Sequence, residues 1–216
     1  MIFLPKFDLD SIFKHLPQAT SMMGVPTFYT RLLTDDRLTK SNTRHMRLFI
    51  SGSAPLLDET HRMFAKQTGH MILERYGMTE TNMNTSNPYE GERRPGTVGF
   101  PLPDVELKIT DAATGDSVPD GEIGQIEVRG PNVFQGYWDM PEKTREELRQ
   151  DGFFITGDLG RKDEEGYIYI AGRNKDLIIS GGYNIYPKEI EKLLDEQAGV
   201  AESAVVGIFH PDFGES

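Results

Sequence analysis

Hydrophobic residues recur with two different periods along the first 86 residues. Short apolar runs with the length of buried strands occur at residues 1–4 (MIFL), 21–25 (SMMGV), 46–51 (MRLFIS) and 71–76 (MILERY). Residues 9–16, 27–33 and 57–67 carry apolar side chains at helical spacing, and Pro26 precedes the second segment as a residue suited to a first helical turn. Strands that alternate with helices predict an α/β fold, with a parallel sheet flanked by helices.

The pattern changes after Asn87, where Pro, Gly and Asp become frequent. Short strands are predicted at residues 105–110, 124–130, 152–160 and 166–172, with a hairpin turn at residues 163–166. Residues 141–150 (PEKTREELRQ) predict a single inserted helix that Pro141 introduces. This part therefore predicts an antiparallel β subdomain.

A third region begins at Lys175. It predicts a strand at residues 176–180, a glycine break, a helix at residues 187–197 and a strand at residues 202–209. We expect residues 1–174 to form the carboxyl-terminal part of a large domain, with an α/β part at 1–86 and a β part at 87–174. Residues 175–216 then begin a small α+β domain, which is incomplete because one helix and two strands bury too little apolar surface.

Composition narrows the function classes. The net charge of −11 argues against nucleic-acid binding, and the chain has no cysteine for disulfides, thiolate metal sites or a Cys nucleophile. No apolar run reaches the roughly 20 residues of a membrane helix, and the five histidines show no i, i+4 pair. We expect no membrane span, no nucleic-acid partner and a cytoplasmic location, with the mitochondrial matrix as the alternative. The sequence does not indicate the oligomeric state.

Three segments offer related chemistry. Residues 74–80 (ERYGMTE) combine an aromatic ring, a turn, a hydroxyl and a carboxylate, a set that suits a purine, a phosphate and a magnesium ion. Residues 156–159 (TGDL) place a carboxylate on a turn, where it suits sugar hydroxyls. Residues 172–191 open with Arg173 and contain a Gly-Gly break after an apolar strand. Taken singly, each has a plain structural interpretation: a core tyrosine, a solvated acid, a turn cap, or an Arg173–Asp176 ion pair.

Taken together and in this order, the three segments resemble the adenylate-forming superfamily of acyl-CoA synthetases, luciferases and peptide-synthetase adenylation domains, over nearly the whole chain. The resemblance implies an enzyme that uses ATP, Mg²⁺ and CoA with a small-molecule carboxylate. It implies catalytic roles for Thr79, Glu80 and Lys175, and magnesium binding by Glu80. It implies ATP or AMP binding by Ser53, Ala54, Pro55, Glu74, Arg75, Tyr76, Gly77, Thr79, Asp158 and Arg173.

Two further roles follow from the resemblance. Lys175 matches a hinge about which the C-terminal domain rotates between adenylation and thioester formation, although a solvated linker lysine would look the same. Gly181 and Gly182 match a close backbone approach to the pantetheine arm of CoA, although a simple turn would also use glycine.

Residues 74–99 and 24–33 resemble malonyl-CoA synthetases in particular. This resemblance implies that Arg31 and Ser53 contact the distal carboxylate of malonate, with Met78 in the same acyl pocket and Met83 and Asn84 as weaker candidates. A solvent-facing Arg31 is the plain alternative. Two other interpretations of the sequence stay open. The substrate is methylmalonate, acetate or another short acid, or the chain is a non-catalytic nucleotide-binding fragment.

Two parts of the superfamily pattern have no match in these residues: the phosphate-binding loop rich in Ser, Thr and Gly, and the lysine that bridges carboxylate and α-phosphate. We therefore expect a central fragment of a longer acyl-CoA ligase that is inactive alone, because the lysine's electrostatic contribution is missing.

Overall fold

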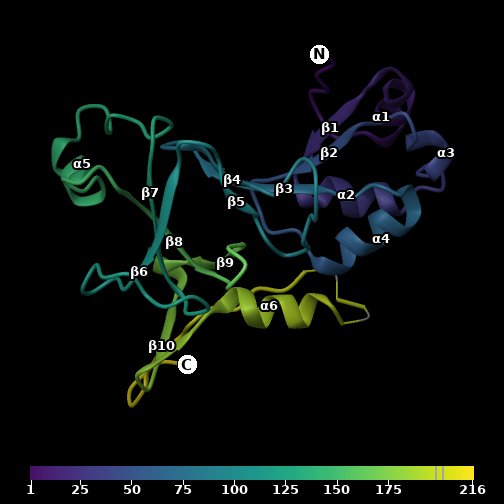
Figure 1. The fold of residues 1–216 in the computed structure, drawn as a ribbon. Coiled ribbons are helices and arrows are strands. Elements are labelled where there is room, and N and C mark those ends of the chain that lie inside the picture. Colours follow the sequence, from purple (N-terminus) through teal and green to yellow (C-terminus); the bar gives the residue numbers. More distant parts are fainter. Residues whose placement is uncertain (198, 201) are drawn as a thin grey trace. The chain divides into compact units, whose positions relative to one another are not determined.

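Five strands form the first sheet, in the order β1-β2-β3-β4-β5 (Figure 1). Their bounds are β1 (Ser21–Gly24), β2 (Leu48–Ser51), β3 (Leu73–Met78), β4 (Asn82–Ser86) and β5 (Phe100–Pro101). β2 runs parallel to both β1 and β3, and Ser51 lies opposite Gly24 on one side and Glu74 on the other. The carboxyl ends of these strands therefore meet at one edge, and the predicted parallel sheet is confirmed.

The helices of this part are α1 (Leu9–His15), the 3₁₀ turn η1 (Leu16–Gln18), α2 (Pro26–Leu33), α3 (Lys40–Thr43) and α4 (Asp58–Thr68). α1 begins after Asp8, whose side chain accepts a hydrogen bond from the Ser11 amide at 2.8 Å. Pro26 is the first residue of α2, and α4 ends at Gly69 with φ 79°. The three predicted helices are confirmed.

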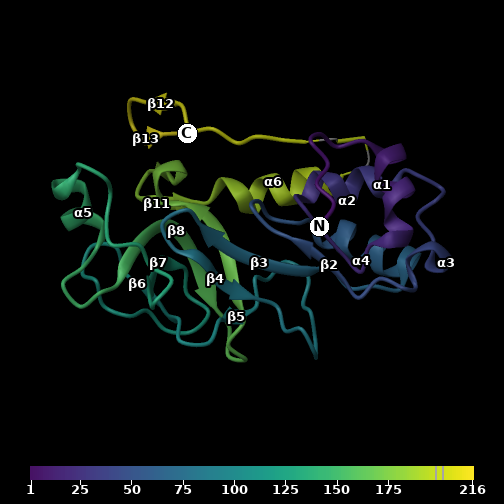
Figure 2. The same cartoon turned by 90° about the horizontal axis from the view of Figure 1, so that it is seen from above.

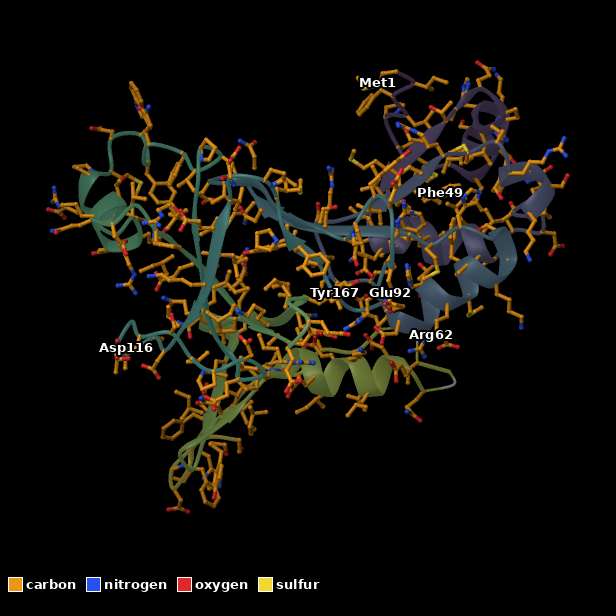
Figure 3. All side chains as sticks on the ribbon, in the orientation of Figure 1. Met1, Phe49, Arg62, Glu92, Asp116 and Tyr167 are labelled. Atoms are coloured by element: carbon orange, nitrogen blue, oxygen red, sulfur yellow. The ribbon has the colours of Figure 1, made fainter. Side chains whose placement is uncertain are left out.

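The core of this part joins α1, α2 and α4 to β2. The rings of Tyr29 and Phe49 meet the ring of Phe64 edge-on, at centroid distances of 5.4 and 4.9 Å. Phe49, which Figure 3 labels, belongs to the buried cluster of this core. The Tyr29 hydroxyl donates to the Ile50 carbonyl oxygen at 2.5 Å, which ties α2 to β2. This packing fixes the loops that leave β1 and β2.

The second sheet has the order β6-β7-β8-β9 and is antiparallel throughout. Its strands are β6 (Glu106–Thr110), β7 (Gly124–Arg129), β8 (Phe154–Lys162) and β9 (Ile168–Arg173), with α5 (Pro141–Glu147) between β7 and β8 (Figure 1). The predicted β subdomain with one inserted helix is confirmed. The helix ends at Glu147 rather than at residue 150 as predicted. Leu148 leaves the helical path because it forms an antiparallel β-bridge with Phe154.

The last region contains a third sheet, with the order β11-β10-β13-β12. Its elements are the 3₁₀ turn η2 (Asn174–Asp176), β10 (Ile178–Ser180), β11 (Tyr183–Ile185), α6 (Pro187–Asp195), β12 (Phe209–His210) and β13 (Gly214–Glu215). Figure 2 shows β12 and β13 as a hairpin beside the carboxyl terminus. The predicted strand and helix of this region are confirmed as β10 and α6.

Two predicted strands are wrong. Residues 1–4 form no strand, since Met1, Ile2 and Phe3 are exposed and contribute nothing to the core. Of residues 202–209, only Phe209 belongs to a strand. The segment is fixed to α6 instead, because Glu191 accepts hydrogen bonds from the Val205 amide and the Ser203 hydroxyl.

The computed structural model describes residues 1–197, 199–200 and 202–216, and these fall into two units. The first comprises Met1–Met78 and Thr85–Phe100, and the second comprises Thr79–Asn84 and Pro101–Ser216. The predicted domain boundaries after residues 86 and 174 stay predictions.

Candidate nucleotide and acyl-substrate site

The first group of candidate residues lies at the carboxyl edge of the parallel sheet. Ser53, Ala54 and Pro55 directly follow β2, at the edge where ligands bind in sheets of this kind. Ser53 has φ 72°, a left-handed conformation that a residue with a side chain adopts only when its surroundings hold it there. Such strained residues cluster at ligand sites, so the conformation of Ser53 is consistent with a binding loop.

β3 carries the neighbouring candidates Glu74, Arg75, Tyr76, Gly77 and Met78. Glu74 is buried and lies opposite Ser51 of β2, whereas the four residues after it extend past the part of β3 that pairs with β2 and are partly buried.

The Arg75 guanidinium reaches β1, where it donates to the Met23 sulfur at 2.9 Å. A side chain at Gly52 would stand 3.4 Å from the Arg75 carbonyl oxygen, so this loop lies directly against β3. The structure thus brings the loop after β2 together with the strand that bears Tyr76.

Arg31 lies on the exposed side of α2. Its guanidinium stands 5.4 Å from the centroid of the Phe7 ring, and Phe7 in turn lies 4.6 Å from the ring of Phe28. Among the described residues, no carboxylate forms an ion pair with Arg31. The side chain is therefore a positively charged group held over an aromatic surface and open to an anionic ligand.

Thr79 and Glu80 form the turn between β3 and β4, with Thr79 exposed and Glu80 partly buried. The Tyr137 hydroxyl contacts two carboxylates, Glu147 Oε2 at 2.6 Å and Glu80 Oε1 at 3.1 Å. Burial is the largest cause that raises the pKa of Tyr137, and the negative charges of Glu147 and Glu80 raise it further. The hydroxyl therefore stays protonated and is the hydrogen-bond donor toward these carboxylates.

No cluster of three or more acidic or histidine side chains suited to a metal occurs in the described residues. A single carboxylate such as that of Glu80 fits Mg²⁺, which proteins often bind through one or two carboxylates together with substrate phosphates.

Asp158 and Arg173 lie opposite each other on β8 and β9. Arg173 Nε is 2.7 Å from Asp158 Oδ1, and only 7% of the Asp158 side chain is exposed. Asp158 lies within β8, so the turn predicted at residues 156–159 is wrong. Its backbone is set by Gly157, with φ 73°, and by Thr156, whose hydroxyl accepts from the Asp158 amide and donates to the Ile126 carbonyl oxygen. Arg173 thus pairs with a candidate ribose-binding carboxylate and not with Asp176.

The remaining candidates lie after β9. Lys175 is exposed in η2, between β9 and β10, and no ion pair with it occurs among the described side chains. Gly181 and Gly182 have φ 57° and 86° and form the two-residue turn that joins β10 to β11. Two successive left-handed residues suit a tight hairpin, so the turn itself accounts for both glycines, and their role toward CoA stays a prediction.

The sequence interpretation missed Tyr137. This residue is 57 positions from Glu80, and its hydroxyl reaches the carboxylate only after α5 and the loop before it are in place. No spacing pattern links the two residues, so only the fold reveals the contact.

Comparison with known proteins assigns the family. The family described as AMP-binding enzyme matches residues 1–138. The chain belongs to this family. Family membership agrees with the resemblance drawn from the motifs and with the fold, whose parallel-containing and antiparallel sheets match those of an adenylate-forming enzyme.

Individual members of the AMP-binding enzyme family are similar to this chain over almost all of its length. The malonate–CoA ligase of Arabidopsis thaliana is 41% identical over 99% of the chain, and a long-chain-fatty-acid–CoA ligase of Bacillus subtilis is 43% identical over 96%. The crystal structure of ATP-bound MatB from Rhodopseudomonas palustris is 66% identical and superposes with a TM-score of 0.96 over 100% of the chain.

The chain spans 38% of the length of both curated relatives and 43% of the MatB chain. Within the described residues, no helix has the length and apolar character needed to cross a membrane.

Proposed function

We propose that this chain is part of an acid–thiol ligase that activates malonate with ATP and transfers the acyl group to CoA. The products are malonyl-CoA, AMP and pyrophosphate. The observation that carries the substrate assignment concerns Arg31, which lies on α2, the helix that follows β1. Its guanidinium is exposed and forms no ion pair with a carboxylate among the described residues. The similarity to the Arabidopsis malonate–CoA ligase supports the same assignment.

The reaction has two steps. A malonate carboxylate oxygen attacks the α-phosphorus of ATP, forming an acyl–phosphate bond while the bond to the pyrophosphate oxygen breaks. The CoA sulfur then attacks the acyl carbon, forming the thioester while the bond to AMP breaks, and the thiol proton leaves to solvent. No covalent bond to the enzyme is needed, which agrees with a chain that has no cysteine.

The candidate residues divide the binding of ATP among them. Tyr76 stacks on adenine, with the Ser53–Pro55 backbone as the opposite wall and Glu74, Arg75 and Gly77 shaping that surface. Asp158 and Arg173 hydrogen-bond the ribose, and the Thr79 hydroxyl binds a phosphate. Glu80 holds Mg²⁺, which when bound offsets phosphate charge.

Two further residue groups serve the second step. Lys175, exposed between β9 and β10, is the point about which the region after it rotates. Gly181 and Gly182 then approach the pantetheine arm, since neither of these two turn residues carries a side chain.

Arg31 distinguishes malonate from a fatty acid. The second carboxylate of malonate is costly to place in a dry pocket without a partner, and a guanidinium offers two parallel hydrogen bonds to it. Ser53 and Met78 complete this acyl end. A long-chain acid has no second charge for Arg31 to bind. The sequence similarity to the Bacillus long-chain ligase therefore does not explain Arg31.

The test compares malonate with acetate in the full-length protein that contains these residues. Arg31→Leu is expected to lower kcat/KM for malonate by roughly 100-fold, as for loss of a charged hydrogen-bonding pair, and to change kcat/KM for acetate little. Arg62→Leu on α4 is the control, because Arg62 is also an exposed helical arginine. Equal losses on both acids, or no loss on malonate, would contradict the assignment.

A further inference from the structure

The turn that carries Glu80 is held by a distant loop of the same unit, residues 130–138. The Phe134 amide donates to the Glu80 carbonyl oxygen at 2.8 Å. The Asn132 side-chain amide lies within hydrogen-bond distance of the Thr81 carbonyl oxygen at 2.7 Å and the Met83 carbonyl oxygen at 3.2 Å. The main chain of the turn is therefore fixed independently of the Glu80 side chain.

Tyr137, at the end of the same loop, is fixed by its own neighbours. Its amide donates to the Thr144 hydroxyl at 3.0 Å, and its ring meets the Phe134 ring edge-on at 4.8 Å. Its hydroxyl has one proton, and Glu147 at 2.6 Å already accepts it at good distance. The second contact, to Glu80 at 3.1 Å, is therefore not needed to satisfy the tyrosine.

The charges around this hydroxyl do not balance. Two carboxylates, Glu80 and Glu147, share a single proton donor, and like charges this close repel each other. Lys143 compensates Glu147, with Nζ 2.5 Å from Glu147 Oε1. Among the described residues, no cation pairs with Glu80 and no donor reaches its Oε2. The arrangement suits an added cation at Glu80.

We propose that Tyr137 is a positioning residue that orients the Glu80 carboxylate toward the metal ion bound with ATP. The hydroxyl holds Oε1, and Oε2 would then be the oxygen offered to the metal ion. Restraint of a metal-ligating carboxylate by a hydrogen-bond partner is a general means of raising metal affinity. This inference rests on the proposed function only for the identity of the nucleotide.

The test is metal binding rather than turnover. Tyr137→Phe keeps the ring and removes the hydroxyl alone. In the full-length protein with a non-hydrolysable ATP analogue, Mn²⁺ titration by electron paramagnetic resonance is expected to show affinity reduced about tenfold. kcat is expected to fall while KM for malonate stays constant. Tyr169→Phe is the matched control, because its hydroxyl also donates to a carboxylate, that of Asp163 at 3.2 Å.

A double-mutant cycle separates positioning from a general structural effect. On a Glu80→Gln background, Tyr137→Phe is expected to cause no further loss of Mn²⁺ affinity. An equal loss on both backgrounds, unchanged affinity in the single variant, or absence of nucleotide-dependent Mn²⁺ binding in the parent would overturn the proposal. If Tyr137→Phe weakens Mn²⁺ binding but the parent does not use malonate, the positioning role stands and the substrate assignment fails.

Discussion

Arg173 Nε lies 2.7 Å from Asp158 Oδ1, and the two residues occupy directly opposed positions on neighbouring antiparallel strands. The acid is almost fully buried, whereas 49% of the arginine side chain is exposed. A β-bulge after Leu159 shifts the register just beyond this pair. Bulges of this kind often aim a side chain at a site, so the pair is a preformed unit rather than an incidental surface contact.

Replacing Arg173 by Leu is expected to weaken ATP binding. The substitution removes a donor to the ligand and leaves the Asp158 carboxylate without its partner, so KM for ATP should rise roughly tenfold or more. Steady-state kinetics of the full-length protein measures this rise. Arg161→Leu is the control, since Arg161 lies on the same pair of strands, its guanidinium stands 4.0 Å from the centroid of the Tyr169 ring, and it forms no ion pair with another described residue. A rise in both variants would show that the effect is structural.

Glu127 on β7 is a buried carboxylate in the second sheet that interacts with two cationic side chains. Its side chain is fully buried and accepts hydrogen bonds from Arg149 at 2.7 and 2.8 Å and from Thr110 at 2.8 Å, while Lys108 Nζ lies 3.1 Å away. Burial alone would raise the pKa of Glu127, but the bonds from Arg149, Thr110 and Lys108 outweigh it and hold the pKa below its usual value.

Glu127→Gln is therefore expected to destabilise the fold by about 3 kcal/mol, because it removes the buried negative charge that pairs with the partly exposed Arg149 and Lys108 and turns a donor toward them. Urea denaturation measures the loss. Glu106→Gln is the matched control: it makes the same chemical change in a carboxylate that is 60% exposed and paired with Arg129, and the unfolding midpoint should stay at the parent value. Equal destabilisation by both substitutions would contradict this account.

His61 makes stability depend on pH. The side chain is buried on α4, its Nε2 lies 2.9 Å from the Ile72 carbonyl oxygen, and burial lowers its pKa. The unfolded chain takes up this proton near pH 6.5 and the folded chain only at lower pH, so the unfolded state binds more protons between the two values. The contribution is complete above about pH 6.5 and is lost as the pH falls toward the lower, folded-state pKa.

His61→Gln keeps a donor for Ile72 and cannot titrate. Its free energy of unfolding should change less than that of the parent between about pH 6.5 and 5. Denaturant titrations across this window measure the difference. If the free energy of unfolding depends on pH equally in the two proteins, His61 is not the cause of the pH dependence.

Much of the fold follows from sequence because local signals are strong. Pro26 at the start of α2 and Gly69 at the end of α4 are visible as single residues. β4 was missed because its sequence, NMNTS, is polar, and its burial comes from neighbouring structure that no local pattern encodes. The segment after α6 was assigned to a strand on its apolar composition, whereas Glu191 holds it by hydrogen bonds.

For the candidate site, sequence motifs identified residues that lie close along the chain. The contact between Arg173 and Asp158 was not foreseen, since Asp176 was the nearer acid in sequence. Tyr137 was missed for the same reason: a hydrogen bond across 57 positions depends on the path of the intervening strands and helix. Long-range polar contacts arise from the fold, so they become visible only with it.

The most direct measurement is AMP release from Mg-ATP and CoA by the full-length protein, with malonate, acetate and a long-chain fatty acid compared at equal concentrations. The account predicts rapid AMP release with malonate, and release slower by at least roughly 100-fold with acetate and with the fatty acid, because neither offers the second carboxylate that Arg31 binds. Equal or faster release with acetate or the fatty acid would contradict it.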